Sequence, residues 1–439
     1  MRLSVSEIAH AVGGRLVGPE LIVDGASYDS RETLPGQVFV PIIGERDGHD
    51  FVDAAIAKGA RVYLSSKGPL TDAATCIEVA DTEVAFMALG SLARTKLPDR
   101  IVGVTGSVGK TSVKDLANAA FRTHYRTKAN PKSLNNELGL PQTLCNAPDR
   151  TEAVIVEMGM RGLGEITRLC EVARPTVGIV TIIGEAHTGR LGGLAGVAQA
   201  KGELVEALPS SGFAILNADQ DVCFDLCHRT SANVVSFGTT KGDVRADAIA
   251  LNDLAQASFI LRTPWGDAPM HLELSGVHMA TNAAAAAAAA LACDVPLHRV
   301  VEGLATARLS PWRMDVRRAP SGLIVINDAY NANPTSMTAA LDALAALPVT
   351  GRRVAILGFM AELDEHGPAR HRAMAEHARE LGIEVVAVAT TDYGIGPTDD
   401  PISVVAGLGS GDAVLFKGSR VTGLETLALQ VLHSEDRSL

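Results

Sequence analysis

The sequence predicts an α/β protein of three domains: a smaller N-terminal α/β domain, a central domain built on a mostly parallel sheet, and a C-terminal domain with a second open α/β sheet. Three observations support this prediction. Short apolar runs alternate with helical segments along nearly the whole chain, which is typical of parallel sheets covered by helices. A glycine-rich turn joins an apolar run to a helix within residues 101–112. The chain has 439 residues, enough for two to four domains.

Composition narrows the classes of partner and compartment. Hydrophobic residues make up 47% of the chain and aromatic residues only 4%, so the cores must consist mostly of Ala, Val, Leu and Ile. The net charge is −11 and no long basic stretch occurs, which argues against nucleic acid as the main partner but not against an anionic small substrate. The six cysteines form no C-x-x-C pair, and no apolar segment is long enough to span a bilayer. We therefore expect a reduced, soluble, cytoplasmic protein without membrane insertion.

The first predicted domain covers residues 1–98. Ser4 and Glu7 have the spacing of a capping box, which predicts a helix near the N-terminus. Beyond it, strands are expected at residues 37–43 and 60–64, and helices at residues 50–58 and 82–95. A polar segment that contains Pro98 leads into the next domain.

The second predicted domain covers residues 99–312. Its clearest strands are expected at residues 101–104, 153–156, 176–182 and 212–216. Residues 236–263 alternate in a turn-rich pattern, which indicates short strands, some of them antiparallel. Residues 282–291 consist almost entirely of alanine, the best helix former, so we expect a buried helix there, capped by Thr281 and Asn282.

The third predicted domain covers residues 313–439. Apolar runs predict strands at residues 323–327, 353–357, 385–389 and 413–417, with helices between them. This alternation indicates a second open sheet, in which ligands gather at the carboxyl ends of the strands.

The glycine-rich turn has the sequence T-G-S-V-G-K-T at residues 105–111 and is followed by Ser112. Gly106, Ser107 and Gly109 allow backbone N–H groups to surround a phosphate at the start of a helix. Lys110 supplies a mobile positive charge, and the Thr111 hydroxyl can reach a magnesium ion. A glycine-rich turn without a ligand is the alternative. The order of strand, glycines, lysine, hydroxyl and helix makes a phosphate loop the better interpretation.

Further polar residues lie where chemistry would need them. Glu157 and His187 each follow a predicted strand, so each can hold a metal at the sheet edge, although loop residues of these types are also often structural. Lys201 lies in a predicted helix, where an exposed lysine is the simpler interpretation. Arg313 lies at the junction to the third domain and can reach back to a phosphate. Asp328 begins a dense polar run after a strand, which favours a recognition site over a plain turn.

These motifs together closely resemble those of the Mur ligase family of peptidoglycan synthesis, over essentially the whole chain. The resemblance rests on residues 28–31 (YDSR), 44–51 (GERDGHDF), 105–111, 133–141 (SLNNELGLP), 157–166 (EMGMRGLGEI), 327–334 (NDAYNANP) and 417–420 (KGSR). Each motif alone is moderate evidence, and their order along one chain is strong evidence.

The resemblance implies a UDP-substrate domain, an ATPase domain and a Rossmann-like C-terminal domain that receives a dipeptide. It implies an ATP-dependent ligase that joins D-alanyl-D-alanine to UDP-N-acetylmuramoyl-tripeptide through an acyl phosphate, and we expect a monomer. ATP and Mg²⁺ are the implied cofactors, with Thr111 and Glu157 at the first magnesium ion, and His187 and a carbamylated Lys201 at the second. The implied catalytic residues are Lys110, Glu157, His187, Lys201 and Arg313.

The remaining implied roles concern the nucleotide and the two substrates. Asn282 corresponds to the family residue near adenine, Arg313 to the one near the γ-phosphate and Asp328 to the one near ribose. The nucleotide also contacts the loop residues Gly106, Ser107, Gly109, Lys110, Thr111 and Ser112. The implied substrate-binding residues are Ser30, Arg31, Asp47, His49, Asn135, Asn136, Tyr330, Asn331 and Asn333.

The sequence departs from the family pattern in places and leaves alternatives open. Phe359 stands where relatives usually carry Asp, which affects dipeptide recognition, and residues 41–44 and 185–190 are also off-pattern. A sister ligase that adds an amino acid, a folate-polyglutamylating relative and a nucleotide-regulated binding protein are the alternatives. The third residue of the tripeptide is lysine or diaminopimelate, and the second substrate is D-alanyl-D-alanine or a depsipeptide.

Overall fold

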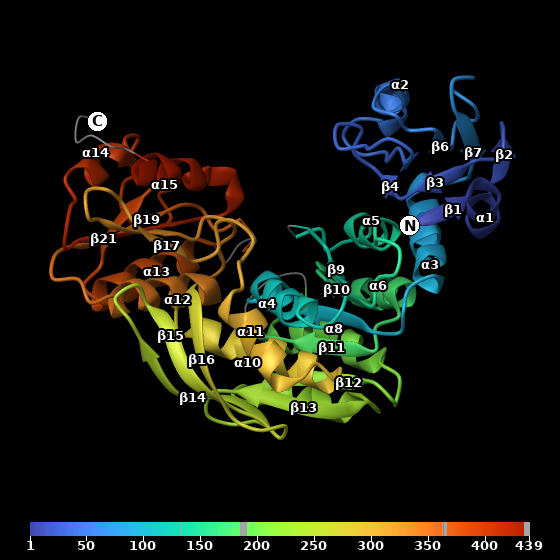
Figure 1. Cartoon of the computed structure of the whole chain (residues 1–439). Helices are drawn as coiled ribbons and strands as arrows, with labels where there is room; N and C mark the ends of the chain where they lie inside the picture. Colours follow the sequence, from blue (N-terminus) through green and yellow to red (C-terminus); the bar gives the residue numbers. More distant parts are fainter. Residues whose placement is uncertain (132, 185–190, 362, 364–366, 434–439) are drawn as a thin grey trace.

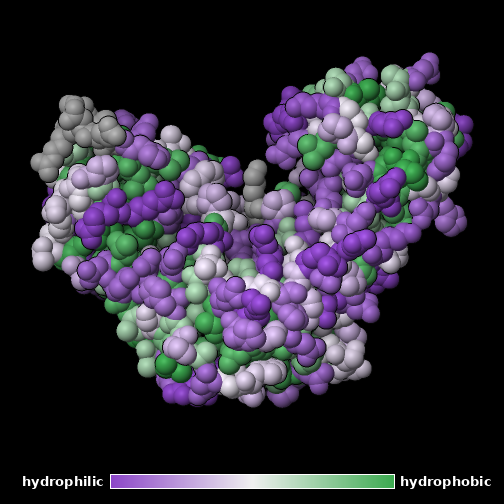
Figure 2. Space-filling model, viewed as in Figure 1, coloured by the Kyte–Doolittle hydropathy of each residue, from purple (hydrophilic) through white to green (hydrophobic). Residues whose placement is uncertain are grey.

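The computed structural model describes residues 1–131, 133–184, 191–361, 363 and 367–433, and these residues form three sheet-based domains. Figure 1 shows the domains as an open V, with the first domain at the upper right, the central domain below and the third domain at the upper left. A deep notch separates the two upper lobes in the space-filling view (Figure 2). Among the described helices, none is long and apolar enough to cross a membrane.

The first domain has a five-stranded sheet of order β2-β7-β6-β5-β4 and an antiparallel pair, β1-β3. The capping box is confirmed, because the Glu7 N–H donates to Ser4 Oγ at 3.1 Å and the Ser4 N–H donates to Glu7 Oε2 at 3.0 Å. The strand expected at residues 37–43 is shorter, since Pro41 has no N–H to donate to a neighbouring strand. The elements are β1 Arg2–Ser4, α1 Val5–Ala11, β2 Arg15–Val17, β3 Ile22–Asp24, β4 Ala26–Ser27, β5 Val38–Phe39, the 3-10 helix η1 Gly48–Phe51, α2 Val52–Ala57, β6 Val62–Ser65, β7 Thr75–Glu78 and α3 Thr82–Thr95.

The central domain has a nine-stranded sheet of order β16-β15-β14-β13-β12-β11-β8-β10-β9. Neighbouring strands are parallel from β9 to β14, and β14, β15 and β16 are antiparallel, as the turn-rich pattern after residue 236 predicts. The elements are β8 Ile101–Thr105, α4 Lys110–Arg122, β9 Thr127–Ala129, α5 Gly139–Cys145, β10 Ala153–Glu157, α6 Glu165–Ala173, β11 Val177–Val180, α8 Leu194–Glu206, β12 Phe213–Asn217, α9 Asp221–Phe224, the 3-10 helix η2 Asp225–Arg229, β13 Asn233–Gly238, β14 Val244–Leu251, β15 Gln256–Arg262, β16 Ala268–Ser275, α10 His278–Ala292 and α11 Leu297–Ala305.

The alanine-rich helix α10 lies in the middle of the central domain, against α4 and several strands of the sheet (Figure 1). All eight residues from 283 to 290 are completely buried. The predicted cap is wrong, because α10 begins at His278 and includes Thr281 and Asn282. Gly276 turns the chain after β16 with φ +103°, and Val277 already has helical dihedral angles, so the helix starts one turn earlier than its alanine run.

The third domain has a five-stranded sheet of order β17-β18-β21-β19-β20, in which only the β17-β18 pair is antiparallel among the described strands. Helix α12 starts with a capping box between Asn333 and Ser336 and has Pro334 in its first turn. The elements are β17 Asp315–Arg318, β18 Ile324–Asn327, α12 Pro334–Ala346, β19 Arg353–Leu357, α13 Gly367–Glu380, β20 Glu384–Ala387, α14 Pro401–Ala406, β21 Ala413–Lys417, the 3-10 helix η4 Arg420–Thr422 and α15 Leu424–His433.

The strands of the central sheet that lead to the predicted site residues end at one edge of that sheet. In the central sheet Glu157 of β10 pairs with Val104 of β8, and Val180 of β11 pairs with Thr105, so these three strands end at the same edge. One continuous apolar core extends from the central domain into α12 of the third domain. The third domain therefore lines the same cavity as the phosphate loop, whereas the first domain shares a separate apolar core with the central domain.

Candidate active site

The phosphate loop connects β8 to α4 and is held by the neighbouring strand end. The Ser107 N–H donates to the Ile182 carbonyl at 2.6 Å, and Ser107 Oγ exchanges hydrogen bonds of 2.9 Å with both backbone groups of Gly184. Gly109 has φ +86°, and a Cβ there would lie 3.0 Å from Asn282 Oδ1. Glycine is thus required where the first turn of α4 passes the side chain of α10.

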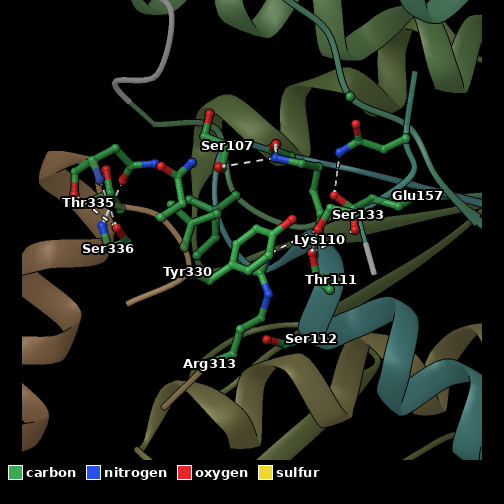
Figure 3. Close-up of a pocket in the computed structure, with 18 of the residues that line it drawn as sticks. Ser107, Lys110, Thr111, Ser112, Ser133, Glu157, Arg313, Tyr330, Thr335 and Ser336 are labelled. Atoms are coloured by element: carbon green, nitrogen blue, oxygen red, sulfur yellow. Dashed lines mark hydrogen bonds between the residues drawn. The ribbon is translucent and has the colours of Figure 1, made fainter. Parts of the chain in front are cut away.

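Lys110 begins α4 and bends back over the loop. Its Nζ donates to the carbonyls of Gly106 at 2.8 Å and Ser107 at 3.4 Å. Figure 3 shows this side chain on the same side of the cavity as Thr111, Ser133 and Glu157. A cation in this position can turn from the loop carbonyls to an incoming phosphate without moving the helix.

Glu157 lies at the end of β10, is 1% exposed and faces α4. Thr111 Oγ1 donates to its Oε2 at 2.7 Å, and Asn135 Nδ2 donates to its Oε1 at 2.7 Å. Within the described residues no three His, Cys, Asp or Glu side chains gather as a metal site. A hydroxyl beside one buried carboxylate nevertheless fits Mg²⁺, which is usually held by one or two protein oxygens together with phosphates and water.

Lys201 is 2% exposed, so the interpretation as an exposed helix lysine is wrong. Helix α8 packs Leu204 onto Gly103 of β8 and Gly178 of β11, and this packing turns Lys201 towards the cavity. Glu203 fixes the same helix, because its carboxylate accepts the N–H groups of Gly164 at 2.7 Å and Thr167 at 2.9 Å. His187, the other proposed ligand of a second metal, lies outside the described residues.

Arg313 reaches into the cavity from the segment between the second and third domains. Its Nη2 donates to Ser133 Oγ at 3.2 Å, and its guanidinium lies 4.2 Å from the centre of the Tyr330 ring. Ser133 Oγ is in turn 3.2 Å from Thr111 Oγ1, so the guanidinium lies close to the hydroxyl–carboxylate pair (Figure 3). This arrangement allows a fork-shaped cation to meet the outermost phosphate of a bound nucleotide.

Asp328 follows β18 and forms a buried ion pair. Its Oδ2 is 2.5 Å from Nζ of Lys417, a residue that is 1% exposed and also donates to the Asn331 carbonyl at 3.1 Å. Asp328 Oδ1 accepts the Met314 N–H at 3.0 Å. The polar run after β18 is therefore an ordered site that links the third domain to the segment carrying Arg313.

The structure brings most of the predicted site residues together around one cavity of about 450 Å³. From the central domain it is lined by the phosphate loop, Asn135, Asn136, Glu157, Lys201 and Asn282, and from the third domain by Asp328, Tyr330, Asn331 and Asn333. Sequence reasoning missed Ser133, Lys417 and Thr335 as individual lining residues. Ser133 and Lys417 stand in motifs that were recognised, and Thr335 follows the polar run at the start of α12.

The four predicted residues of the first domain lie away from this cavity. His49 is buried: its Nδ1 is 2.6 Å from Asp47 Oδ1, and its Nε2 accepts the Ser66 N–H at 3.1 Å. Hydrogen bonds from Lys67 and His49 hold the pKa of Asp47 well below its usual range. Arg31 is exposed beside Ser30 and pairs with Asp29. Asp47 and His49 thus shape a loop of the first domain, and contact of these four residues with substrate stays a prediction.

Known proteins share both the domains and the full length of this chain. Residues 104–290 match the Mur ligase middle domain, and residues 312–414 match the Mur ligase glutamate ligase domain. The UDP-N-acetylmuramoyl-tripeptide–D-alanyl-D-alanine ligase of Mycobacterium tuberculosis is 35% identical, with 100% of this chain and 93% of that protein covered. The ligase of the same name from Escherichia coli is 34% identical, with 93% and 89% covered.

Solved structures agree with these matches. A crystal structure of MurF from Acinetobacter baumannii has a TM-score of 0.89 at 30% identity, with 99% of both chains covered. MurF ligase from Thermotoga maritima in complex with ADP has a TM-score of 0.78 at 25% identity, with 93% of this chain and 97% of that chain covered. Fold and site thus define a three-domain, nucleotide-dependent ligase with a phosphate loop. By its domain matches and its full-length relatives, the chain belongs to the Mur ligase family.

Proposed function

We propose that this protein joins D-alanyl-D-alanine to UDP-N-acetylmuramoyl-tripeptide at the expense of ATP, with Mg²⁺ as the metal. The observation that carries the proposal is the cavity between the domains. There Lys110, Arg313 and Lys417 line the same space as a buried carboxylate, Glu157, and two helix N-termini, those of α4 and α12, open into it. The names of the full-length relatives support this choice of substrates.

The site must bring two anions together, because the tripeptide carboxylate attacks the γ-phosphate of ATP. The new bond joins a carboxylate oxygen to phosphorus, and ADP leaves. We assign Lys110 and the loop N–H groups to the phosphates and Arg313 to the charge that develops on the transferred group. Thr111 and Glu157 would hold Mg²⁺, which supplies further positive charge at the phosphates when bound.

The amine of the dipeptide then attacks the acyl phosphate, so that an amide bond forms, phosphate leaves and the amine loses a proton. Water must be kept from the acyl phosphate until this step. The third domain already contacts the central one, so we propose that it presents the dipeptide and that Asp328 contacts the ribose. We also propose that the first domain holds the UDP group over the open notch and closes on it.

Lys201 has a proposed role that its burial supports. An unmodified ammonium at a magnesium site would repel the metal, whereas a carbamate carries a negative charge and oxygen donors. Lys201 lines the cavity and is only 2% exposed, so its side chain faces the site and not the solvent. We therefore propose that Lys201 is carbamylated and that it shares a second metal with His187.

The test is phosphate release from ATP by the purified protein. With UDP-tripeptide and D-alanyl-D-alanine together we expect steady release and an amide product of matching mass. With either substrate alone we expect less than a few per cent of that rate. Phosphate release at the same rate with and without the dipeptide, or with a single amino acid in its place, would contradict the proposal and favour a sister ligase. Release in the absence of any UDP substrate would favour a nucleotide-regulated protein.

The same assay tests the third residue of the tripeptide. Tripeptides ending in lysine and in diaminopimelate are compared, and a neighbouring structure from Acinetobacter baumannii at 30% identity names 2,6-diaminopimelate in its title. We propose diaminopimelate as the better substrate by at least tenfold in kcat/KM. We expect the reaction in the cytoplasm, where its ATP is available, and a monomer in solution, which sedimentation would test.

A further inference from the structure

Residues 310–314 form the passage from the central to the third domain, and Arg313 lies within it. The residues on either side of Arg313 have left-handed backbone conformations, with φ +63° at Trp312 and φ +48° at Met314. Residues other than glycine adopt such conformations only where their surroundings hold them. The direction in which Arg313 points therefore depends on what fixes the backbone on both sides of it.

On the central side, Asp115 of α4 holds the passage. Its Oδ2 accepts the Ser310 N–H at 2.7 Å, and its Oδ1 is 2.8 Å from Nζ of Lys114. Lys114 is 1% exposed and also donates to the Asn130 carbonyl at 3.1 Å. The pair thus lies on the helix that starts with Lys110, about one turn further along, and binds the passage three residues before Arg313.

On the other side, Asp328 repeats the arrangement. Its Oδ1 accepts the Met314 N–H, and its Oδ2 pairs with the buried Lys417. Two carboxylates, one from each domain, therefore accept backbone N–H groups before and after Arg313. Each carboxylate is paired with its own buried lysine. Charged hydrogen bonds of this kind are short and strongly directional.

We infer that Asp115 is a positioning residue for Arg313, and that Lys114 orients Asp115 for this task. The inference rests on the role proposed above for Arg313 at the transferred phosphate. Asp115 touches neither cavity nor substrate, so it acts only through the Ser310 N–H and the course of the passage. A displacement of about 1 Å in a catalytic group is enough to reduce turnover by about 100-fold.

The experiment compares two double variants, K114M/D115N and K114M/D115A. Both lack the ion pair and the Lys114 bond to Asn130, so they share the same losses of charge and packing around Lys114. Only the first retains a side-chain oxygen that can accept the Ser310 N–H. We expect kcat for amide formation to be at least tenfold higher in K114M/D115N than in K114M/D115A, with KM for ATP equal within threefold. Equal kcat values would overturn the inference.

The same pair is then measured in the Arg313→Ala background. If Asp115 acts through Arg313, the tenfold ratio falls to less than twofold, and a ratio that persists would overturn the inference while leaving the role of Arg313 intact. Unchanged turnover in Arg313→Ala alone would overturn both. Asp412→Ala is the matched control, because Asp412 accepts the N–H groups of Arg352 and Gly409 at the opposite end of β21. Asp412→Ala should leave kcat unchanged. A tenfold loss of kcat in this control would mean that the loss in K114M/D115A reflects lower stability, and it would overturn the inference.

Discussion

Replacing Glu157 by glutamine separates the charge of this buried carboxylate from its hydrogen bonds. Glutamine has the same shape, and its one oxygen can accept the N–H of Asn135 as Glu157 Oε1 does now at 2.7 Å. The Thr111 hydroxyl can rotate to accept from the new amide, because a hydroxyl both donates and accepts. The free energy of unfolding should therefore fall by less than about 1.5 kcal/mol, the size of one ordinary hydrogen bond.

The activity should respond far more strongly than the stability. Loss of a single electrostatic contact at the reacting phosphates typically costs about 100- to 1000-fold in kcat, which is roughly 2.7–4 kcal/mol. Phosphate release is measured over a range of Mg²⁺ concentrations, and the half-saturating concentration should rise in Glu157→Gln. Glu152→Gln is the control, since Glu152 precedes the same strand and is bonded to Arg126 at the surface. A kcat within tenfold of the parent would refute the placing of Mg²⁺ at Glu157.

Three further outcomes are expected. Lys110→Ala should lower kcat by about 100- to 1000-fold and leave Tm nearly unchanged, because the Gly106 and Ser107 carbonyls to which its ammonium donates lie at the cavity. Unchanged turnover would contradict its phosphate role. Lys201→Ala should lose most activity and recover part of it with acetate and bicarbonate, whereas a rate near that of the parent would exclude the carbamate. Burial lowers the pKa of His371 in the folded protein, against the opposing effects of the Gly367 carbonyl and Asp392. As the pH falls, His371 is therefore protonated in the unfolded chain before it is protonated in the folded protein. Stability should fall below about pH 6.5, by at most about 1.4 kcal/mol per pH unit for this one group, and calorimetry of His371→Gln should show that part of the slope removed.

The phosphate loop could be predicted from the sequence because its function depends on local order. Strand, glycines, lysine and helix are consecutive, so no distant contact is needed to recognise them. The strands at residues 353–357 and 413–417 were likewise predicted with their observed bounds, since buried parallel strands are continuous apolar runs.

Other parts of the site depend on contacts that the sequence does not express. The burial of Lys201 follows from two glycines in strands far away along the chain, which let α8 approach the sheet. The cap predicted at Thr281 and Asn282 was wrong because a positive φ at Gly276 determines where α10 begins. His49 stood in a recognised motif, yet hydrogen bonds to Asp47 and Ser66 saturate its ring.

Phe359, which the sequence analysis expects to depart from the family pattern, lies in an aromatic cluster. Its ring is stacked on His371 at 5.2 Å between centres, and His371 also meets Tyr393 edge-on. The His371 ring accepts the Met360 N–H at 2.9 Å and bonds the Gly367 carbonyl at 2.7 Å. Phe359 and Met360, which follow β19, are thus held by an aromatic cluster that the residue type alone did not predict.

The alanine helix α10 makes the centre of this protein unusually intolerant of change. Its eight consecutive alanines have no exposed surface, so even one added methylene must push aside a neighbouring helix or strand. A saturation-mutagenesis map should therefore show a block of forbidden positions that touches no substrate. Within this helix, resistance to an inhibitor bound near Asn282 could then arise only at the residues that line the cavity, His278, Met279, Thr281 and Asn282.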